Sequence, residues 1–261
     1  MELIDTHCHL TFEQLAGDIE GIITRSRAAG VLSWITVGTD SSENRKAVNL
    51  AGRFEDMYAA VGIHPHYAKD VTADDIEELK KLAQNKKVVA IGETGLDFHY
   101  NFSGRDAQKQ IFCRHLEIAS QFNLPLIVHS REAFDETMQI LAQFGSSVKE
   151  TVFHCFSGSA DQAKAVLDMG FYVSFTGVVT FKNAQKTRLA AQTVPLDRLM
   201  LETDCPYMSP EPMRMQKINE PALMLHTAAY MAQLRGMNLS DFAAAVTATS
   251  RSFFNLGHKS V

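Results

Sequence analysis

Eight short apolar segments, each followed by a segment with helical periodicity, constrain the fold of this 261-residue chain most strongly. The alternation repeats roughly every thirty residues along the sequence. The apolar segments are rich in β-branched residues, as in VLSWITV at 31–37, which favours strands. Strands that alternate with helices indicate a parallel sheet, and eight of them indicate closure into a barrel. We therefore expect an α/β fold, a TIM (β/α)8 barrel, with residues 1–261 in a single domain.

The first expected strand starts at residues 3–4 and leads into 5–9. The other expected strands are 31–37, 58–63, 88–92, 124–128, 151–153, 171–175 and 199–201. The expected helices are 13–29, 41–53, 72–84, 104–122, 132–144, 161–169, 183–192, 221–234 and 240–254. The alternative is an open doubly wound sheet. Because no Gly-x-Gly-x-x-Gly follows any expected strand, we prefer the barrel.

The composition is that of an ordinary globular protein, with 46% apolar and 21% charged residues. The chain shows neither a signal peptide nor an apolar run long enough to cross a membrane, so we expect no membrane segment. Its cysteines are scattered, which favours reduced thiols and a cytoplasmic location; they are Cys8, Cys113, Cys155 and Cys205. A net charge of −5 without long basic runs argues against strong non-specific DNA binding, so phosphate contacts should be local.

His7 and His9 follow the first apolar segment, and on a strand both would project to the same side. Two such imidazoles can hold one metal ion, although a lone His-x-His also occurs as an ordinary polar strand end. Later strands also end in metal-capable residues, namely His64, Glu93, His129, His154 and Asp204. In a barrel these strand ends meet at one rim, where the active site lies.

This pool of imidazoles and carboxylates suits Zn, Mn, Fe or Ni, with Mg less favoured. The six ligands His7, His9, Glu93, His129, His154 and Asp204 are too many for one four-coordinate ion and suit two ions that share a bridge. We expect His7, His9 and Asp204 to hold one ion and His129 and His154 the other. Glu93 is the expected bridging carboxylate.

Six ordered segments carry these residues: DTHCHL at 5–10, GIHPH at 62–66, GETGLD at 92–97, HSR at 129–131, HCFSG at 154–158 and ETDCPY at 202–207. They resemble the successive motifs of the TatD family of metal-dependent hydrolases, over residues 4 to about 225. The resemblance implies a TIM barrel of the amidohydrolase-like superfamily with one or two divalent metals. It also implies hydrolysis of DNA phosphodiesters, typically by a magnesium- or manganese-stimulated nuclease that trims from the 3′ end. The metal ligands it implies are the same six residues.

The segment RMQKINEP at 214–221 departs from the family pattern, which has a basic loop with a glycine before Asn-Glu-Pro. Arg214 and Lys217 keep two cations, but the glycine is missing, so strand and substrate preference stay open. We include Asn219 of this segment among the expected substrate-binding residues.

The expected mechanism is attack on phosphorus by a metal-activated water that Asp204 orients or deprotonates. Glu202 faces the same side as Asp204 and would act as a further acid or ligand; alternatively, it is only a paired interior carboxylate. His64 and Arg131 would hold phosphate oxygens or protonate the leaving group. Catalytic roles are thus expected for Asp204, Glu93, Glu202, His64 and Arg131, and substrate contacts for His64, His66, Arg131 and Asn219.

Three further sets of residues have two alternative roles or no expected role in the site. Asp97 either caps the loop after Glu93 or orients a histidine. The loop with His99, Tyr100 and Phe102 either stacks a base or anchors itself in the core. The remaining histidines are expected at the surface, namely His115, His226 and His258.

We therefore expect a DNase with two divalent ions (Mg, Mn or Zn), acting on DNA or a small phosphodiester. Sequence spacing does not encode the bond that is cleaved, so two alternatives stay open. An amide or ester hydrolase, or a deaminase, of the same superfamily is the first alternative. A metal-containing scaffold that binds nucleic acid or a partner without catalysis is the second. No obligate protein partner is indicated, and we expect a monomer.

Overall fold

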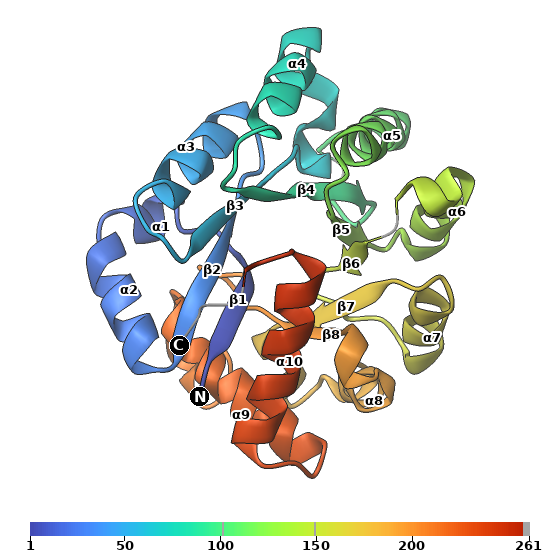
Figure 1. Cartoon of the computed structure of the whole chain (residues 1–261). Coiled ribbons are helices and arrows are strands. Elements are labelled where there is room, and N and C mark those ends of the chain that lie inside the picture. The colour runs from blue at the N-terminus through green and yellow to red at the C-terminus, as the bar shows by residue number, and fades with distance from the viewer. Residues whose placement is uncertain (101, 149, 258–261) are drawn as a thin grey trace. The chain divides into compact units, whose positions relative to one another are not determined.

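The computed structural model of the chain describes residues 1–100, 102–148 and 150–257. Its eight strands are β1 (Leu3–Cys8), β2 (Val31–Val37), β3 (Met57–Val61), β4 (Val88–Asp97), β5 (Leu126–Arg131), β6 (Thr151–Phe153), β7 (Tyr172–Phe175) and β8 (Leu199–Leu201) (Figure 1). They form one sheet in the order β1 to β8. A doubly wound sheet reverses its strand order at a switch point, so this consecutive order shows that the alternative is wrong.

Hydrogen bonds also join the last strand and its following turn to the first strand. Thr6 Oγ1 donates to the carbonyl of Leu201 at 3.0 Å. The N–H of Asp204 donates to the carbonyl of His7 at 2.9 Å, and that of His9 to Cys205 at 2.8 Å. A consecutive eight-stranded sheet whose last strand bonds to its first is a closed (β/α)8 sheet, which confirms the predicted TIM-barrel fold class.

In the described residues, ten α-helices and six short 3-10 helices lie between the strands or follow the last one. The α-helices are α1 (Glu13–Ala16), α2 (Ile19–Ala28), α3 (Ser41–Ala51), α4 (Ala73–Leu82), α5 (Arg105–Phe122), α6 (Phe134–Phe144), α7 (Ala160–Asp168), α8 (Gln185–Thr193), α9 (Met224–Leu234) and α10 (Leu239–Phe253). The 3-10 helices are η1 (Pro65–Asp70), η2 (Gly145–Ser147), η3 (Gly177–Thr180), η4 (Leu196–Arg198), η5 (Met213–Met215) and η6 (Pro221–Leu223).

Several observed elements differ from the expected ones, for example β5, which spans Leu126–Arg131 rather than 124–128, and two of the differences affect the description of the site. The helix predicted over 13–29 is divided into α1 and α2, because Gly17 and Asp18, both poor helix formers, separate them. The strand predicted over 88–92 continues to Asp97 as β4, since β5 pairs beside it as far as Arg131. Glu93 therefore lies within a strand rather than after one.

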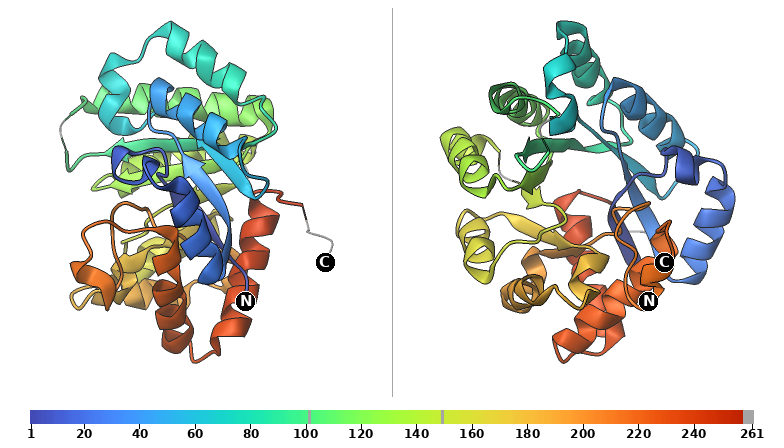
Figure 2. Two further views of the ribbon diagram at one scale, coloured as in Figure 1. Left: turned by 90° about the vertical axis from the view of Figure 1, so that its left-hand side faces the viewer. Right: turned by 180° about the vertical axis from the view of Figure 1, so that it is seen from behind.

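The described residues form two compact units, and each is described by itself: residues 1–35 with 155–261, and residues 36–154. In the first unit, α10 packs against β1 and β8, and α9 lies beside α10 (Figure 2). Thr247 of α10 donates a hydrogen bond to the carbonyl of Glu2 at 2.7 Å, and Phe242 of the same helix is fully buried. A single domain over residues 1–261 stays a prediction.

The second unit contains the parallel strands β3 to β6, and α5 packs against β4 (Figure 1). Gly95 of β4 pairs with His129 of β5 in an unusually close approach of the two backbones. A Cβ atom on Gly95 would lie 2.1 Å from the carbonyl oxygen of His129, and the φ angle of Gly95 is +132°. Only glycine fits this position, because any other side chain would overlap the backbone of β5.

His115 of α5 is fully buried, so its predicted surface position is wrong. The N–H of Ile63 donates to Nε2 of His115 at 2.9 Å, and Nδ1–H of His115 donates to the carbonyl of Ile111 at 2.7 Å. Both ring nitrogens are thus used by a neutral imidazole. Burial lowers the pKa of His115 to about 4, because the charged form would lose its hydration.

Two further expectations concern thiols and membranes. All four cysteines are free thiols, and all lie in the described part of the chain. Within residues 1–100, 102–148 and 150–257, no helix is both long and apolar enough to cross a membrane.

Gly95→Ala should lower the free energy of unfolding by about 3 kcal/mol, because the methyl group would force β4 and β5 apart in a backbone conformation that alanine avoids. Urea denaturation of the variant and the wild type measures the change. Gly17→Ala is the control, since its Cβ has no neighbour within 4 Å and its φ is −76°. Equal stability of the Gly95 variant and the wild type would contradict the close approach.

The buried His115 should make the protein less stable in acid. The unfolded imidazole takes up a proton near pH 6.5, whereas the folded one does so only near pH 4, so stability is lost as the pH falls through this window. Between pH 7 and pH 4 the wild type should lose about 3 kcal/mol more than His115→Gln. Denaturant unfolding of both proteins across this range measures the difference. Parallel curves would show that His115 does not cause the loss.

Candidate metal centre

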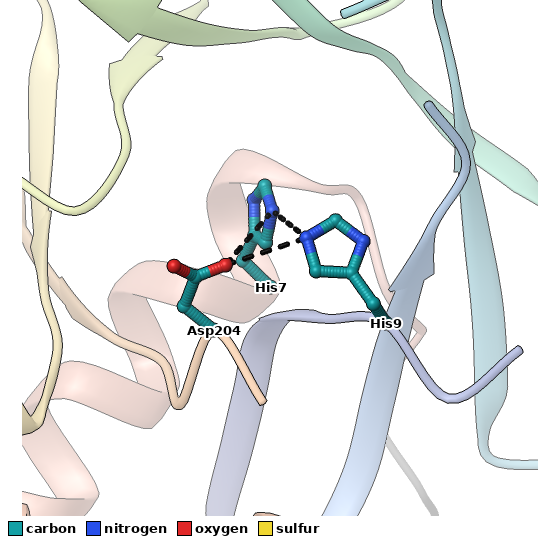
Figure 3. Close-up of side chains that lie close together, drawn as sticks. All are labelled: His7, His9 and Asp204. Carbon is teal, nitrogen blue, oxygen red and sulfur yellow. Dashed lines mark hydrogen bonds and ion pairs between the residues drawn. The ribbon is translucent and has the colours of Figure 1, made fainter. Parts of the chain in front are cut away.

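The first group of candidate ligands lies in the unit of residues 1–35 and 155–261. His7 belongs to β1, His9 follows it directly, and Asp204 lies in the turn after β8 (Figure 3). The Nε2 atoms of His7 and His9 are 3.2 Å apart. Oδ1 of Asp204 is 3.3 Å from His9 Nε2 and 3.7 Å from His7 Nε2. All three side chains are largely buried and face one another, as predicted from the strand ends.

These distances fit a divalent cation. A tetrahedral ion with ligand bonds of about 2.1 Å separates its ligand atoms by about 3.4 Å. The three separations in this group, 3.2, 3.3 and 3.7 Å, bracket that value. The donor set of two imidazole nitrogens and one carboxylate oxygen suits zinc or manganese.

Asp5 connects the two chain segments that carry the first group. It accepts hydrogen bonds from the N–H of Thr203 at 2.9 Å and from its hydroxyl at 2.6 Å. The N–H of His7 lies 3.4 Å from the same carboxylate. Burial raises the pKa of Asp5 to about 7, although the hydrogen bonds from Thr203 oppose the rise. Asp5 thus fixes the position of Asp204 relative to His7.

Asn219 stabilises the turn that contains Asp204. It is fully buried, and its side-chain amide donates to the carbonyls of Thr203 at 3.1 Å and Tyr207 at 2.6 Å. Asp204 itself has a φ angle of 54°, which non-glycine residues seldom adopt. The structure therefore gives Asn219 a role in holding this turn, while its predicted contact with substrate stays a prediction.

The second group lies in the unit of residues 36–154, around one oxygen of Glu93. Oε1 of Glu93 is 2.7 Å from His154 Nε2, 2.9 Å from His129 Nδ1 and 3.5 Å from His64 Nε2. The facing nitrogens of His129 and His154 are 3.3 Å apart. Glu93 comes from β4 and His129 from β5. His154 directly follows β6, and His64 lies after β3, immediately before η1. The predicted pair His129 and His154 is thus brought together with Glu93.

The electrostatics of the second group keep Glu93 ionised. Burial alone would raise the pKa of Glu93, but the neighbouring His154, His64 and His129 outweigh it and lower the pKa well below its usual value. Burial lowers the pKa of His64 well below its usual value, although Glu93 opposes this. An ionised carboxylate surrounded by imidazole nitrogens is a suitable donor set for a divalent ion.

Asp97 is the site residue that the predicted set of functional residues omits. Its Oδ2 lies 3.0 Å from Nε2 of His129 and 3.0 Å from Nε2 of His66. Its Oδ1 accepts hydrogen bonds from the N–H groups of His99 at 3.0 Å and Tyr100 at 2.9 Å. Both open readings, a loop cap and a carboxylate that orients a histidine, are therefore correct. Its even spacing from Glu93 on one strand, four residues, was the available signal.

Glu202 and Arg131 have other partners in the structure. Glu202 accepts hydrogen bonds from the N–H of Cys155 and the hydroxyl of Ser174, both at 2.6 Å, which fits the alternative of a paired interior carboxylate. The guanidinium carbon of Arg131 lies 4.7 Å from the centre of the Tyr100 ring, and the side chain is exposed. The catalytic roles of both residues, and the bridge by Glu93, stay predictions.

Comparisons with known proteins match almost the whole chain. The family model for TatD-related DNases matches residues 4–255, a span that contains both groups. The metal-dependent hydrolase YabD of Bacillus subtilis (strain 168) is 39% identical over 97% of this chain and 99% of its own length. The 3′-5′ ssDNA/RNA exonuclease TatD of Pantoea ananatis is 36% identical over 97% of this chain and all of its own length, 100%. The crystal structure of the TatD homologue YjjV from Escherichia coli K12 superimposes with a TM-score of 0.92 and 31% identity, over 98% of both chains.

Proposed function

We propose that this chain, which belongs to the family of TatD-related DNases, cleaves single-stranded DNA from its 3′ end as an exonuclease. Membership of the family makes the protein a metal-dependent hydrolase that acts on ester bonds. The observation that carries the proposed nuclease activity is the convergence of His64, His129 and His154 on one oxygen of Glu93. Relatives named 3′-5′ ssDNA/RNA exonucleases, at 36% and 34% identity, support the choice of substrate.

We propose two divalent ions, Mg, Mn or Zn, as cofactors. His7, His9 and Asp204 would hold one, and Glu93, His129 and His154 the other, with Glu93 as the bridging ligand. When bound, such ions acidify a coordinated water and neutralise charge that develops at phosphorus. The ligand separations in both groups support this assignment.

The proton transfers are assigned to side chains of this protein. Asp204 accepts the proton of the attacking water, because its carboxylate lies beside the two histidines of the first group, with Oδ1 3.3 Å from His9 Nε2. His64 donates a hydrogen bond from Nε2 to the phosphate or the leaving oxygen. This tautomer follows from Nδ1, which accepts the N–H of His66 at 3.2 Å. Arg131 pairs with non-bridging phosphate oxygens, and Glu202, two residues before Asp204, acts as a further acid or ligand.

A cytoplasmic location and a monomeric state complete the proposal. The four free thiols support a reducing compartment. A net charge of −5 supports binding through local contacts with the strand rather than through a broad basic face.

Cleavage of DNA should require a divalent metal and Asp204. Metal-stripped protein is incubated with 5′-labelled single-stranded DNA and Mg²⁺, Mn²⁺ or Zn²⁺ in turn, and the products are separated on a gel. We expect a ladder that shortens from the 3′ end, with kcat about a thousand-fold lower in Asp204→Asn because the proton acceptor is lost. Asp168→Asn is the matched control, since Asp168 only pairs with Lys164 at the surface of α7.

Two outcomes would contradict this proposal. Absence of cleavage with every ion, together with turnover of amides, would indicate an amide hydrolase of the same superfamily. Strong DNA binding that persists without cleavage, and also in His129→Ala with His154→Ala, would indicate a non-catalytic scaffold.

Each of the two groups should account for one bound ion. His129→Ala with His154→Ala should reduce the stoichiometry from about two ions to about one, as measured by elemental analysis after gel filtration. Asp97→Ala should raise the dissociation constant of one of the two ions by about 10- to 100-fold in titration calorimetry, because His129 loses the carboxylate that orients it. His226→Ala on α9 is the control. An unchanged stoichiometry in the double variant would remove His129 and His154 from the ligand set.

A further inference from the structure

Two large aromatic rings stand exposed in the loop between β4 and α5. The side chains of Tyr100 and Phe102 belong to residues that are 41% and 56% exposed. Their rings are stacked, with centres 5.4 Å apart and planes inclined by 13°. His66 meets both rings edge-on, at 5.4 Å and 4.8 Å. We call Tyr100, Phe102 and His66 the aromatic shelf. Its exposure shows that the rings are not a core anchor, the alternative considered for this loop.

Buried polar side chains hold the shelf in place. Gln108 of α5 bonds to both the N–H and the carbonyl of Asp97, at 2.8 and 2.9 Å, and donates to the carbonyl of Ser103 at 2.9 Å. The hydroxyl of Ser103 donates to the carbonyl of His66 at 2.7 Å and accepts the N–H of Lys69 at 3.1 Å. The loop and η1 are thus fastened to each other on both sides of the rings. A preorganised surface loses little conformational entropy when a ligand stacks on it.

The shelf is continuous with the Glu93 group. Asp97 contacts both His66 of the shelf and His129 of the group, at 3.0 Å each. The rings of His64 and His66 are 4.2 Å apart between centres. The guanidinium carbon of Arg131 also lies over the Tyr100 ring, 4.7 Å from its centre. A flat ligand stacked on the shelf would therefore lie beside the guanidinium of Arg131. Asp97 alone would lie between His66 of the shelf and His129 of the Glu93 group.

We propose that the aromatic shelf binds a nucleobase near the 3′ end of the substrate strand, with Arg131 on its phosphate. The inference rests on the proposed nuclease function and specifies how that site selects its substrate. Every base has a π face, so stacking gives affinity that does not depend on sequence. It also suits a protein of net charge −5, because stacking adds affinity that does not depend on a positive net charge. Because a base in a duplex already stacks and pairs, the shelf favours single strands and frayed ends.

The test compares two single-stranded oligonucleotides that differ only in bases: one is complete, and in the other the last two nucleotides at the 3′ end are abasic. For the wild type, kcat/KM should be about ten-fold or more higher for the complete strand. In the double variant that carries both Tyr100→Ala and Phe102→Ala, the ratio of the two kcat/KM values should fall toward one. Phe102→Leu, which keeps apolar area but removes one π face, should lower the ratio less. Tyr67→Ala is the control, because Tyr67 is equally exposed, at 46%, but lies outside the shelf.

The same two strands, labelled at the 5′ end, are also titrated with metal-stripped protein while fluorescence anisotropy is recorded. The affinity ratio should follow the ratio of kcat/KM, because stacking needs no metal. A wild-type ratio of one in both assays, or a ratio that survives in the double variant, would overturn the shelf as a base site. Metal-dependent cleavage of both strands in that case would leave the nuclease function intact. A base-dependent affinity without any cleavage would instead support the shelf and refute the nuclease.

Discussion

The second unit depends on one buried charge, the carboxylate of Glu93. A buried carboxylate is unfavourable unless charged or hydrogen-bonding groups compensate it, and here imidazoles from the ends of β3, β5 and β6 do so. Compensation requires these strands to keep their register with β4. The close approach at Gly95 fixes the β4–β5 pair at His129 itself. The geometry of the candidate ligands and the packing of the sheet are therefore a single constraint, and a change in either displaces the other.

Much of the fold and of the ligand set could be predicted because both depend on short-range periodicity. The alternation of strands and helices, and the shared direction of His7 and His9, follow from spacing alone. The double role of Asp97 could not be predicted, because it depends on β4 continuing past Glu93 alongside β5, a long-range pairing. His115 was misplaced for a different reason. It follows Phe112 by three residues on the buried stripe of α5, so the pattern was informative and the polar residue type was misleading.

The two units illustrate different ways to fix a histidine. In the second unit, Asp97 contacts the imidazole of His129 directly, and Gln108 in turn fixes the backbone of Asp97. In the first unit, the ring of His9 stacks on Phe12 with 4.5 Å between centres, while Asp5 and Asn219 hold the turn of Asp204 through its backbone. Direct carboxylate contact sets the tautomer as well as the position of a ring, whereas stacking sets the position alone.

The bonds between Asp5 and Thr203 join residues that are 198 positions apart in the chain. Contacts of such long sequence separation form late, because the loop between them must first be ordered. During synthesis His7 and His9 are made well before Asp204, because they precede it in the chain. The first group consequently cannot exist on an unfinished chain. His7 and His9 therefore lack their carboxylate partner until the segment after β8 has been made.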